Sequence, residues 1–381
     1  MKKVLVVHNK YQNIGGEDIS VYEEVKLLSK FYNVETIYFE NRVDNIFSLL
    51  LTFIFSNNPR SNRIFKNKIR EFNPDIIYIH NTWFKASLGI FKIAKKNQIK
   101  TVLKIHNFRY HCTKSHSSKK HIGKNKCCEA CGFDGEKYKI YNKYFNDSYL
   151  KSFFVNLYGK RYIKIINDDA LAVILLTSFH KNFMKNNNYK NKQLYVVPNF
   201  ILPTTKIERN DTNYIVYAGR ISKEKGVEEL IGTFLSHNSE LILKIIGEGP
   251  LLNSLKERYR DKNIEFLGEL SNNETLKIIV NSRAVVTATK LYEGQPTLLC
   301  EATALGIPSV FPETGGIAEF FPKNYALSFE QHNYDELSKI LTDLDDIENM
   351  KRIGEENKAF YLKNFNSDNY INKMEKIFDE R

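Results

Sequence analysis

The sequence has 381 residues, of which 42% are hydrophobic and 13% aromatic, and it carries a formal net charge of +12. This length exceeds one ordinary core and fits two domains, and the apolar fraction excludes an intrinsically disordered chain. The longest apolar run, Ile46–Phe55, is well short of the roughly 20 residues that span a bilayer, and the amino-terminal segment is too short in its apolar part for a secretory signal.

Short apolar runs in the first half of the chain alternate with longer amphipathic segments. We predict strands at Val4–His8, Val34–Phe39, Asp75–His80, Thr101–His106 and Ala170–Leu176. Parallel strands joined by helices form an open, doubly wound sheet that binds ligands at the carboxyl ends of its strands. Residues 1–200 are therefore predicted to form one Rossmann-like domain.

A second series of the same kind begins after a predicted linker at Phe200–Asn213. We predict its strands at Tyr214–Ala218, Leu241–Ile246, Ile264–Leu267, Ala284–Ala288 and Ser309–Phe311. The predicted fold class is therefore α/β, with a second Rossmann-like domain at residues 201–365. A final amphipathic segment, Asp368–Phe378, follows a helix cap at Asn366 or Ser367.

A turn and a helix start follow the predicted strand at 284–288. Glu293 and Gly294 form the turn, and Pro296 is predicted to begin the helix, because proline gives up an amide that has no partner there. The amides of Thr297 and Leu298 then point out of the helix amino end, where the helix dipole favours phosphate oxygens.

Two carboxylates flank this helix start. Glu293 precedes the helix and is suited to hold sugar hydroxyls, whereas Glu301 lies on the helix and is suited to a ribose diol. Together they would bracket a diphosphate from opposite ends. Isolated pairs of this kind are usually solvated, but the turn, the proline and the helix start favour a ligand site.

Two glycine turns follow predicted strands of the second half. In the first, Gly219 precedes Arg220 and Lys225, whose charges can neutralise a diphosphate leaving group and so stabilise a transition state. By itself this string is more typical of a solvated basic turn. The second turn, at Gly247, fits either a nucleotide-binding turn or a plain strand-to-helix connection.

A glycine pair lies shortly after the first predicted strand. Gly15 and Gly16 open a helix and allow the backbone to approach a phosphate or an acceptor. The pattern is not the spaced triple-glycine fingerprint, so NAD is not expected. A glycine turn without a ligand is an equally good interpretation.

Histidines end two predicted strands of the first sheet. A single histidine in such a place is usually structural, but because His80 and His106 stand at equivalent strand ends, a functional role is an equally good interpretation. His111, His116 and His121 follow at a spacing that matches neither a helix nor a strand.

The stretch Lys85–Lys126 holds twelve basic residues and no acidic one. Such a block attracts an anionic partner, which could be a phospholipid surface, a pyrophosphate-linked acceptor or nucleic acid, although a solvated basic face is an alternative. The apolar run Ile46–Phe55, followed by several cations, fits either a membrane interface or an ordinary buried helix.

Five cysteines suggest a reduced, intracellular setting. Cys300 stands alone, and the others lie in residues 107–139, a stretch without a clear period. Cys128 and Cys131 have metal-knuckle spacing, but no second such pair is present. A structural zinc on Cys112, Cys128, Cys131 and a loop histidine is one interpretation, and unpaired loop thiols are the other.

Taken together, these motifs resemble glycosyltransferase family 4, which has the GT-B fold. In the second half the resemblance rests on Gly219-Arg220, Lys225, Gly247-Glu-Gly249 and Glu293-x7-Glu301 with its trailing segment to Pro308. In the first half, bacterial members that build surface polysaccharides are similar at Asn13–Asp18, Pro74–Phe84, Ile105–Arg109 and the cysteines. The match covers nearly the whole chain.

The resemblance implies two Rossmann-like domains facing across a cleft, with residues 366–381 returning to the first domain. It assigns catalytic roles to His106 and Glu293. It assigns donor binding to Gly15, Gly16, Gly219, Arg220, Lys225, Gly247, Gly294, Gln295, Pro296, Thr297, Leu298 and Glu301. Members of the family retain anomeric configuration and require no cofactor or catalytic metal, so the nucleotide-diphosphate sugar is the co-substrate.

The sequence departs from the family at three places. Gln295 replaces a residue that is commonly apolar or aromatic, which leaves donor selectivity open. Tyr78 replaces the first histidine of a frequent His-x-His pair. A further cysteine that some similar members carry is missing, which weakens a complete zinc site.

The predicted function is transfer of a sugar, from a UDP-linked donor, to a polyprenyl-diphosphate-linked or oligosaccharide acceptor in surface polysaccharide synthesis. We expect a cytoplasmic enzyme at the inner face of the membrane, contacting anionic lipid through Lys85–Lys126 and Ile46–Phe55, and no nucleic acid. One alternative is a nucleotide-sugar epimerase of the same fold, which would convert its donor without an acceptor. A basic nucleic-acid-binding protein is the second, although no such module is recognisable.

Overall fold

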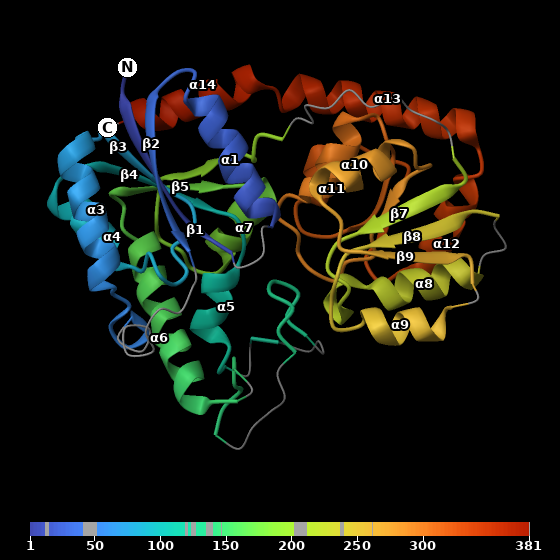
Figure 1. The fold of residues 1–381 in the computed structure, drawn as a ribbon, viewed down its shortest axis with the longest axis horizontal. Coiled ribbons are helices and arrows are strands. Elements are labelled where there is room, and N and C mark those ends of the chain that lie inside the picture. Colours follow the sequence, from blue (N-terminus) through green and yellow to red (C-terminus); the bar gives the residue numbers. More distant parts are fainter. Residues whose placement is uncertain are drawn as a thin grey trace. The chain divides into compact units, whose positions relative to one another are not determined.

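The computed structural model describes residues 1–11, 15–40, 52–118, 121–122, 127–134, 140–145, 147–201, 212–236, 240–260 and 262–380. The chain divides into two compact units: Met1–Phe200 with Ser367–Arg381, and Ile201–Asn366. Each unit contains a six-stranded parallel sheet with helices packed around it (Figure 1). The predicted α/β class with two Rossmann-like domains is confirmed.

The first sheet has the strand order β2-β1-β3-β4-β5-β6. Its strands are β1 (Lys3–Lys10), β2 (Asn33–Glu40), β3 (Ile76–Ile79), β4 (Lys100–Ile105), β5 (Leu171–Leu175) and β6 (Leu194–Val196). The first five overlap the predicted strands. Of these, β1, β3, β4 and β5 are inner strands, which are buried on both faces and form continuous apolar runs, whereas β2 lies at an edge of the sheet. The edge strand β6 is too short to show such a pattern.

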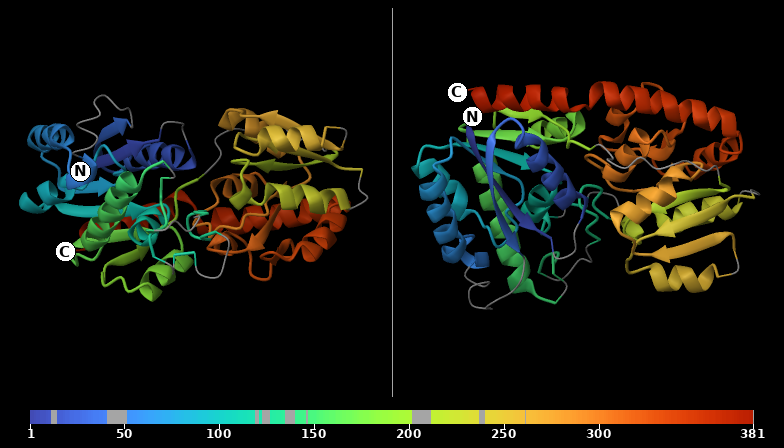
Figure 2. Two further views of the ribbon diagram at one scale, coloured as in Figure 1. Left: turned by 90° about the horizontal axis from the view of Figure 1, so that it is seen from below. Right: turned by 45° about the horizontal axis from the view of Figure 1, so that its top comes forward.

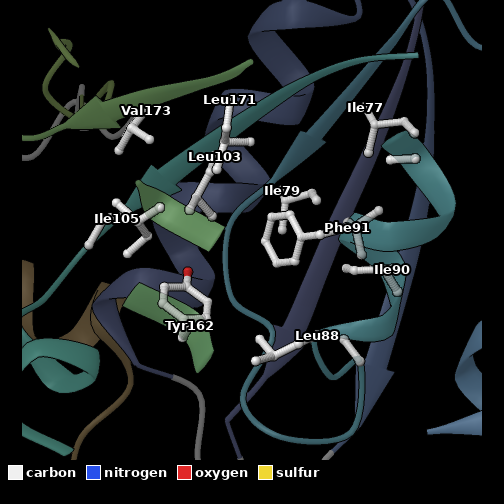
Figure 3. Close-up of a cluster of buried hydrophobic side chains, with 14 of the residues drawn as sticks. Ile77, Ile79, Leu88, Ile90, Phe91, Leu103, Ile105, Tyr162, Leu171 and Val173 are labelled. Carbon is white, nitrogen blue, oxygen red and sulfur yellow. The ribbon is translucent and has the colours of Figure 1, made fainter. Parts of the chain in front are cut away.

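Helices cover both faces of this sheet. They are α1 (Gly16–Leu28), α3 (Pro59–Phe72), α4 (Gly89–Lys96), α5 (Arg109–Ser115), α6 (Tyr149–Ile166), α7 (Ser178–Asn186) and α14 (Ser367–Asp379). On one face, Ile79 and Leu103 pack with Phe91 of α4 and Tyr162 of α6 (Figure 3). This core fixes the strands whose ends carry His80 and His106.

On the opposite face, α1 and α14 pack over the same strands. Met374 and Phe378 of α14 share a buried cluster with Val6 and Tyr78. Lys2 pairs with Asp379, so the two ends of the chain lie side by side in this unit (Figure 2).

The second sheet has the order β12-β11-β10-β7-β8-β9. Its strands are β7 (Tyr214–Ala218), β8 (Ile242–Ile246), β9 (Ile264–Gly268), β10 (Val285–Val286), β11 (Ser309–Glu313) and β12 (Ser328–Glu330). Its helices are α8 (Val227–Ser236), α9 (Leu252–Arg258), α10 (Asn272–Val280), α11 (Thr297–Ala304), α12 (Tyr334–Asp343) and α13 (Ile347–Asn364), with short 3-10 helices η1 (Lys223–Lys225) and η2 (Ile317–Phe320). The short edge strand β12 was not predicted.

One helix lies in a region for which no regular structure was predicted, residues 107–139. Helix α5 forms there because it packs closely on α6: the Tyr110 and Tyr162 rings stack with centroids 3.5 Å apart. A side chain at Gly159 of α6 would meet the Lys114 backbone at 2.5 Å, so glycine permits this approach. Most of the predicted linker, residues 202–211, lies outside the described residues.

Candidate functional site

The helix start predicted in the second unit is α11. The helix begins at Thr297, one residue later than predicted, because the ψ of 92° at Pro296 is extended and makes that residue the N-cap. The Cys300 amide donates to the Pro296 carbonyl at 3.0 Å. The amides of Thr297 and Leu298, in the first turn, consequently have no carbonyl partner within the helix.

Glu293 and Lys225 are in direct contact. Lys225 Nζ lies 2.5 Å from Glu293 Oε1, and Thr289 Oγ1 donates to the same oxygen at 3.1 Å. Both side chains remain about a quarter exposed, Lys225 at 28% and Glu293 at 23%. The residue predicted to bind a diphosphate and the residue predicted to bind a sugar are thus brought together.

A glycine that was not predicted holds the Glu293 backbone. Gly315 has a φ of +61°, and a Cβ there would lie 2.3 Å from the Glu293 carbonyl oxygen. The neighbouring Gly316 amide donates to that carbonyl at 2.8 Å. In the sequence, the adjacent pair Gly315 and Gly316, a few residues after the predicted strand at 309–311, could have indicated this close approach.

The loop that carries Lys225 is fixed against the end of the central strands. It ends at Gly226, whose φ is +66° and where a Cβ would lie 1.9 Å from the Ala288 carbonyl oxygen. The Lys290 amide donates to the Glu224 carbonyl at 3.0 Å. These contacts place Lys225 beside Glu293, whereas the Arg220 side chain is exposed.

The two predicted glycine turns touch each other. A Cβ at Gly247, which has a φ of +128°, would lie 2.1 Å from the Gly219 carbonyl oxygen. The ends of β7 and β8 can therefore approach closely because Gly247 lacks a side chain. Gly294 lies in a half-buried bend before α11.

Two polar side chains near α11 are buried. Gln295 is 8% exposed, and its Nε2 lies 3.8 Å from Cys300 Sγ. Glu301 is 6% exposed, and its Oε1 accepts a hydrogen bond of 3.2 Å from Asn272 Nδ2. Burial raises the pKa of Glu301 to about 7, against the lowering effect of Asn272.

This carboxyl makes stability depend on pH. Between about pH 4.5 and 7 the unfolded chain loses the Glu301 proton while the folded chain keeps it, so the free energy of unfolding falls as pH rises. At about 1.4 kcal/mol per pH unit the loss is at most ~3.5 kcal/mol. We expect Glu301→Gln to raise the Tm at pH 8 more than at pH 5, measured by calorimetry. Equal Tm changes at both pH values would contradict the assignment.

In the first unit, the two strand-end histidines are adjacent. His80 Nδ1 and His106 Nε2 lie 3.0 Å apart, and the rings stack with centroids 5.3 Å apart. Burial lowers the pKa of both well below the usual value, and for His106 the nearby Lys104 lowers it further. Both imidazoles are therefore neutral at pH 7, and one donates to the other.

A buried ion pair lies behind these histidines. Lys104 and Glu24 are fully buried and paired, and Tyr78 Oη donates to Glu24 Oε2 at 3.0 Å. The same oxygen lies 4.0 Å from His80 Nε2. Lys104 belongs to the predicted basic block but faces the core, so it adds nothing to a surface that binds anions.

The glycine pair lies at the start of α1. The Gly15 amide donates to Asp18 Oδ2 at 2.9 Å, and His8 Nε2 lies 2.9 Å from Asp18 Oδ1. Among the described residues, a Cβ at Gly15 would meet Asp18 Oδ2, at 3.9 Å. Packing against the described residues therefore does not require glycine at this position. Asn13, in the same motif, lies outside the described residues.

Polar side chains surround His106 in a small pocket that was not predicted. Tyr11, Glu17, Asn107 and Arg109 line it with the histidine. Tyr11 Oη donates to Glu17 Oε2 at 2.9 Å, and the Arg109 guanidinium lies 5.5 Å from the centre of the Tyr11 ring. The volume of the pocket is about 10 Å³, which is room for about one water molecule.

Known proteins resemble the chain in sequence. Residues 203–360 match the family model for Glycosyl transferases group 1. The O-antigen biosynthesis glycosyltransferase WbnH of Escherichia coli is 26% identical over 215 residues, which are 54% of this chain and 59% of that protein. An uncharacterized glycosyltransferase of Methanocaldococcus jannaschii is 26% identical over 228 residues, 58% of this chain and 63% of the relative. The chain thus spans about three fifths of the length of these two relatives.

Solved structures resemble the whole chain. The lipopolysaccharide outer core galactosyltransferase WaaB matches with a TM-score of 0.64 and 16% identity, over 98% of both chains. HepE of Anabaena, solved with UDP, matches with a TM-score of 0.68 and 14% identity, over 100% of both chains. These likenesses establish the fold, and the match to the Glycosyl transferases group 1 model covers residues 203–360.

Proposed function

We propose that the protein is a retaining hexosyltransferase that moves a sugar from a UDP-linked donor to a polyprenyl-diphosphate-linked or oligosaccharide acceptor in surface polysaccharide synthesis. The observation that carries the proposal is the contact of Lys225 with Glu293, 2.5 Å, beside the amino end of α11. A cation, a carboxylate and free helix amides suit the phosphates and hydroxyls of a nucleotide sugar.

Each of these groups has a role in the proposed reaction. The amides of Thr297 and Leu298, with Arg220 and Lys225, hold the diphosphate and stabilise the negative charge that grows on it as the sugar departs. Glu293 accepts hydrogen bonds from sugar hydroxyls, and Glu301 holds the ribose. No step requires a cofactor beyond the nucleotide sugar itself.

In the first unit the proposal gives His106 a hydrogen bond to the transferred sugar. Its imidazole is neutral because burial lowers its pKa, so it can donate or accept a hydrogen bond without adding charge. His80, 3.0 Å away, fixes the ring orientation. Gly15 and Gly16 leave room for a phosphate or an acceptor.

The relatives support this proposal over its alternatives. WbnH is named for O-antigen biosynthesis, and TuaC of Bacillus subtilis, 26% identical over 132 residues, for putative teichuronic acid biosynthesis. HepE was also solved with UDP-glucose. Neither a nucleotide-sugar epimerase nor a nucleic-acid-binding protein is favoured by these matches.

A donor screen by titration calorimetry tests the proposal. UDP-sugars should bind, and the bound sugar should be transferred to a polyprenyl-diphosphate-linked saccharide with release of one UDP per product. Conversion of the donor without an acceptor or UDP release would instead identify an epimerase. Failure of every nucleotide sugar to bind would overturn the proposal.

We also propose that the first unit contacts an anionic membrane surface. In the described part of the chain, no helix is long and apolar enough to cross a membrane. Phe55 and Ile64 are nevertheless 61% and 45% exposed, and the side chains of Arg60 and Arg63 are exposed on the same helix as Ile64. Apolar side chains among cations suit the interface of an anionic bilayer.

The double variant Arg60→Ser/Arg63→Ser should bind vesicles containing phosphatidylglycerol about 30-fold more weakly, at ~1 kcal/mol per cation. Co-sedimentation measures the partition. Lys256→Ser/Lys323→Ser removes the same charge from exposed positions of the second unit and should leave binding unchanged. Equal loss in both double variants would show that only net charge matters.

A further inference from the structure

Four potential metal ligands converge in the first unit. The sulfurs of Cys112, Cys128 and Cys131 and a ring nitrogen of His121 all lie within 4.8 Å of one another. Cys112 belongs to α5, and the other three belong to the segment that follows it. Although Cys127 is next to Cys128, it is not one of the four.

Two of the distances between these atoms match tetrahedral coordination. Cys112 Sγ and Cys128 Sγ are 3.9 Å apart, and Cys131 Sγ and His121 Nε2 are 3.6 Å apart. For Zn–S of ~2.3 Å and Zn–N of ~2.0 Å, a tetrahedron separates two sulfurs by about 3.8 Å and a sulfur and a nitrogen by about 3.5 Å. Both distances therefore fit ligands around one ion.

The backbone between two of the cysteines forms a closed turn. The Gly132 amide donates to the Cys128 carbonyl at 2.7 Å, and the Cys128 amide donates to the Phe133 carbonyl at 2.9 Å. Gly132 has a φ of +72°, which lets the chain reverse directly after Cys131. A turn of this kind directs both thiols of a Cys-x2-Cys pair to one side.

The surroundings are apolar and aromatic. Cys112 is 1% and Cys128 7% exposed. The His121 ring stacks on Phe133, which stacks on Tyr144 with centroids 6.0 Å apart. Thiols are weak hydrogen-bond donors, and such surroundings offer them few polar partners, whereas a divalent cation satisfies three thiolates and an imidazole at once.

We propose that Cys112, His121, Cys128 and Cys131 bind one Zn²⁺ in a structural site. Four protein ligands complete the tetrahedron and leave no position for water or substrate, so the ion holds structure rather than performing chemistry. On binding, the three thiols release their protons to solvent. The ion joins residues 121–122 and 127–134 to α5, which begins three residues after His106. It thereby fixes the loop that follows the His106 pocket.

Zinc content of the purified full chain tests the site, independently of any transferase activity. Elemental analysis should find about one zinc per chain in the wild type. Cys128→Ser and His121→Ala should lower the zinc content at least about tenfold, whereas Cys127→Ser should leave the zinc content unchanged. His121→Cys should also keep it, because four cysteines are an equally good structural zinc set.

Cobalt keeps the test valid where a variant fails to fold. Wild-type protein refolded with Co²⁺ should give the visible absorption of tetrahedral cobalt with thiolate charge-transfer bands. The proposal is overturned by wild-type protein that holds less than about a tenth of a zinc per chain, by unchanged zinc in Cys128→Ser, or by a Cys112–Cys128 disulfide in a non-reducing peptide map.

Discussion

Replacing Glu293 with glutamine is expected to lower kcat/KM for sugar transfer about 10³-fold. Glutamine has nearly the same volume as glutamate but lacks the charge that strengthens hydrogen bonds from sugar hydroxyls. Removing one preorganised group of this kind from an active site lowers the rate about 10²–10³-fold. Glu293 is held by Lys225 and Thr289, at 2.5 and 3.1 Å, so its geometry is set before the donor binds.

The same variant should not weaken binding of UDP. Lys225 loses its carboxylate partner in Glu293→Gln and becomes more available to a phosphate, so calorimetry should give an equal or lower Kd. A variant that had merely unfolded would lose both properties. If Glu293→Gln transferred sugar to an acceptor with a kcat/KM within about tenfold of the wild type, Glu293 would have no direct role in the reaction.

Glu229→Gln is the matched control for this experiment. Glu229 is also paired with a lysine of the second unit, Lys290, at 2.5 Å, but it lies outside the proposed site. Its rate of transfer should stay within about twofold of the wild type. If Glu293→Gln and Glu229→Gln lost activity equally, the loss would reflect a lower stability of the second unit rather than a role of Glu293 in the reaction.

The double variant Arg220→Ala/Lys225→Ala is expected to weaken UDP binding by about 3–6 kcal/mol. Each charge-assisted contact to phosphate contributes roughly 1.5–3 kcal/mol, and the affinity should therefore fall about 10²–10⁴-fold. Arg220→Lys should have an intermediate effect, because lysine keeps the charge but cannot bind two oxygens as a planar fork.

Uridine distinguishes a phosphate contact from general damage to the site. It lacks the diphosphate, so the double variant should bind it as the wild type does. Lys223→Ala/Lys256→Ala removes two charges from the same unit and should leave the Kd of UDP unchanged. Unchanged UDP affinity in the Arg220/Lys225 variant, or equal loss of uridine and UDP, would contradict the assigned role.

The strand pattern was readable from the sequence because inner strands of parallel sheets are apolar on both faces. Tyr214–Ala218 was predicted with its observed bounds. The strands β6 and β12 were missed, since each has three residues at a sheet edge and too little burial to impose a pattern. Helix α5 was missed because contacts with α6, rather than its own periodicity, stabilise it.

The sequence by itself determined the two parallel α/β sheets, the helix start after Pro296 and the cations that precede it, because these depend on local patterns. Only the tertiary structure decided that Lys225 meets Glu293, 68 residues away, that His80 contacts His106, and that Lys104 is buried against Glu24 rather than exposed. It also gathered the three cysteines around His121. Contacts between distant residues depend on how strands and helices pack, and no local pattern records that packing.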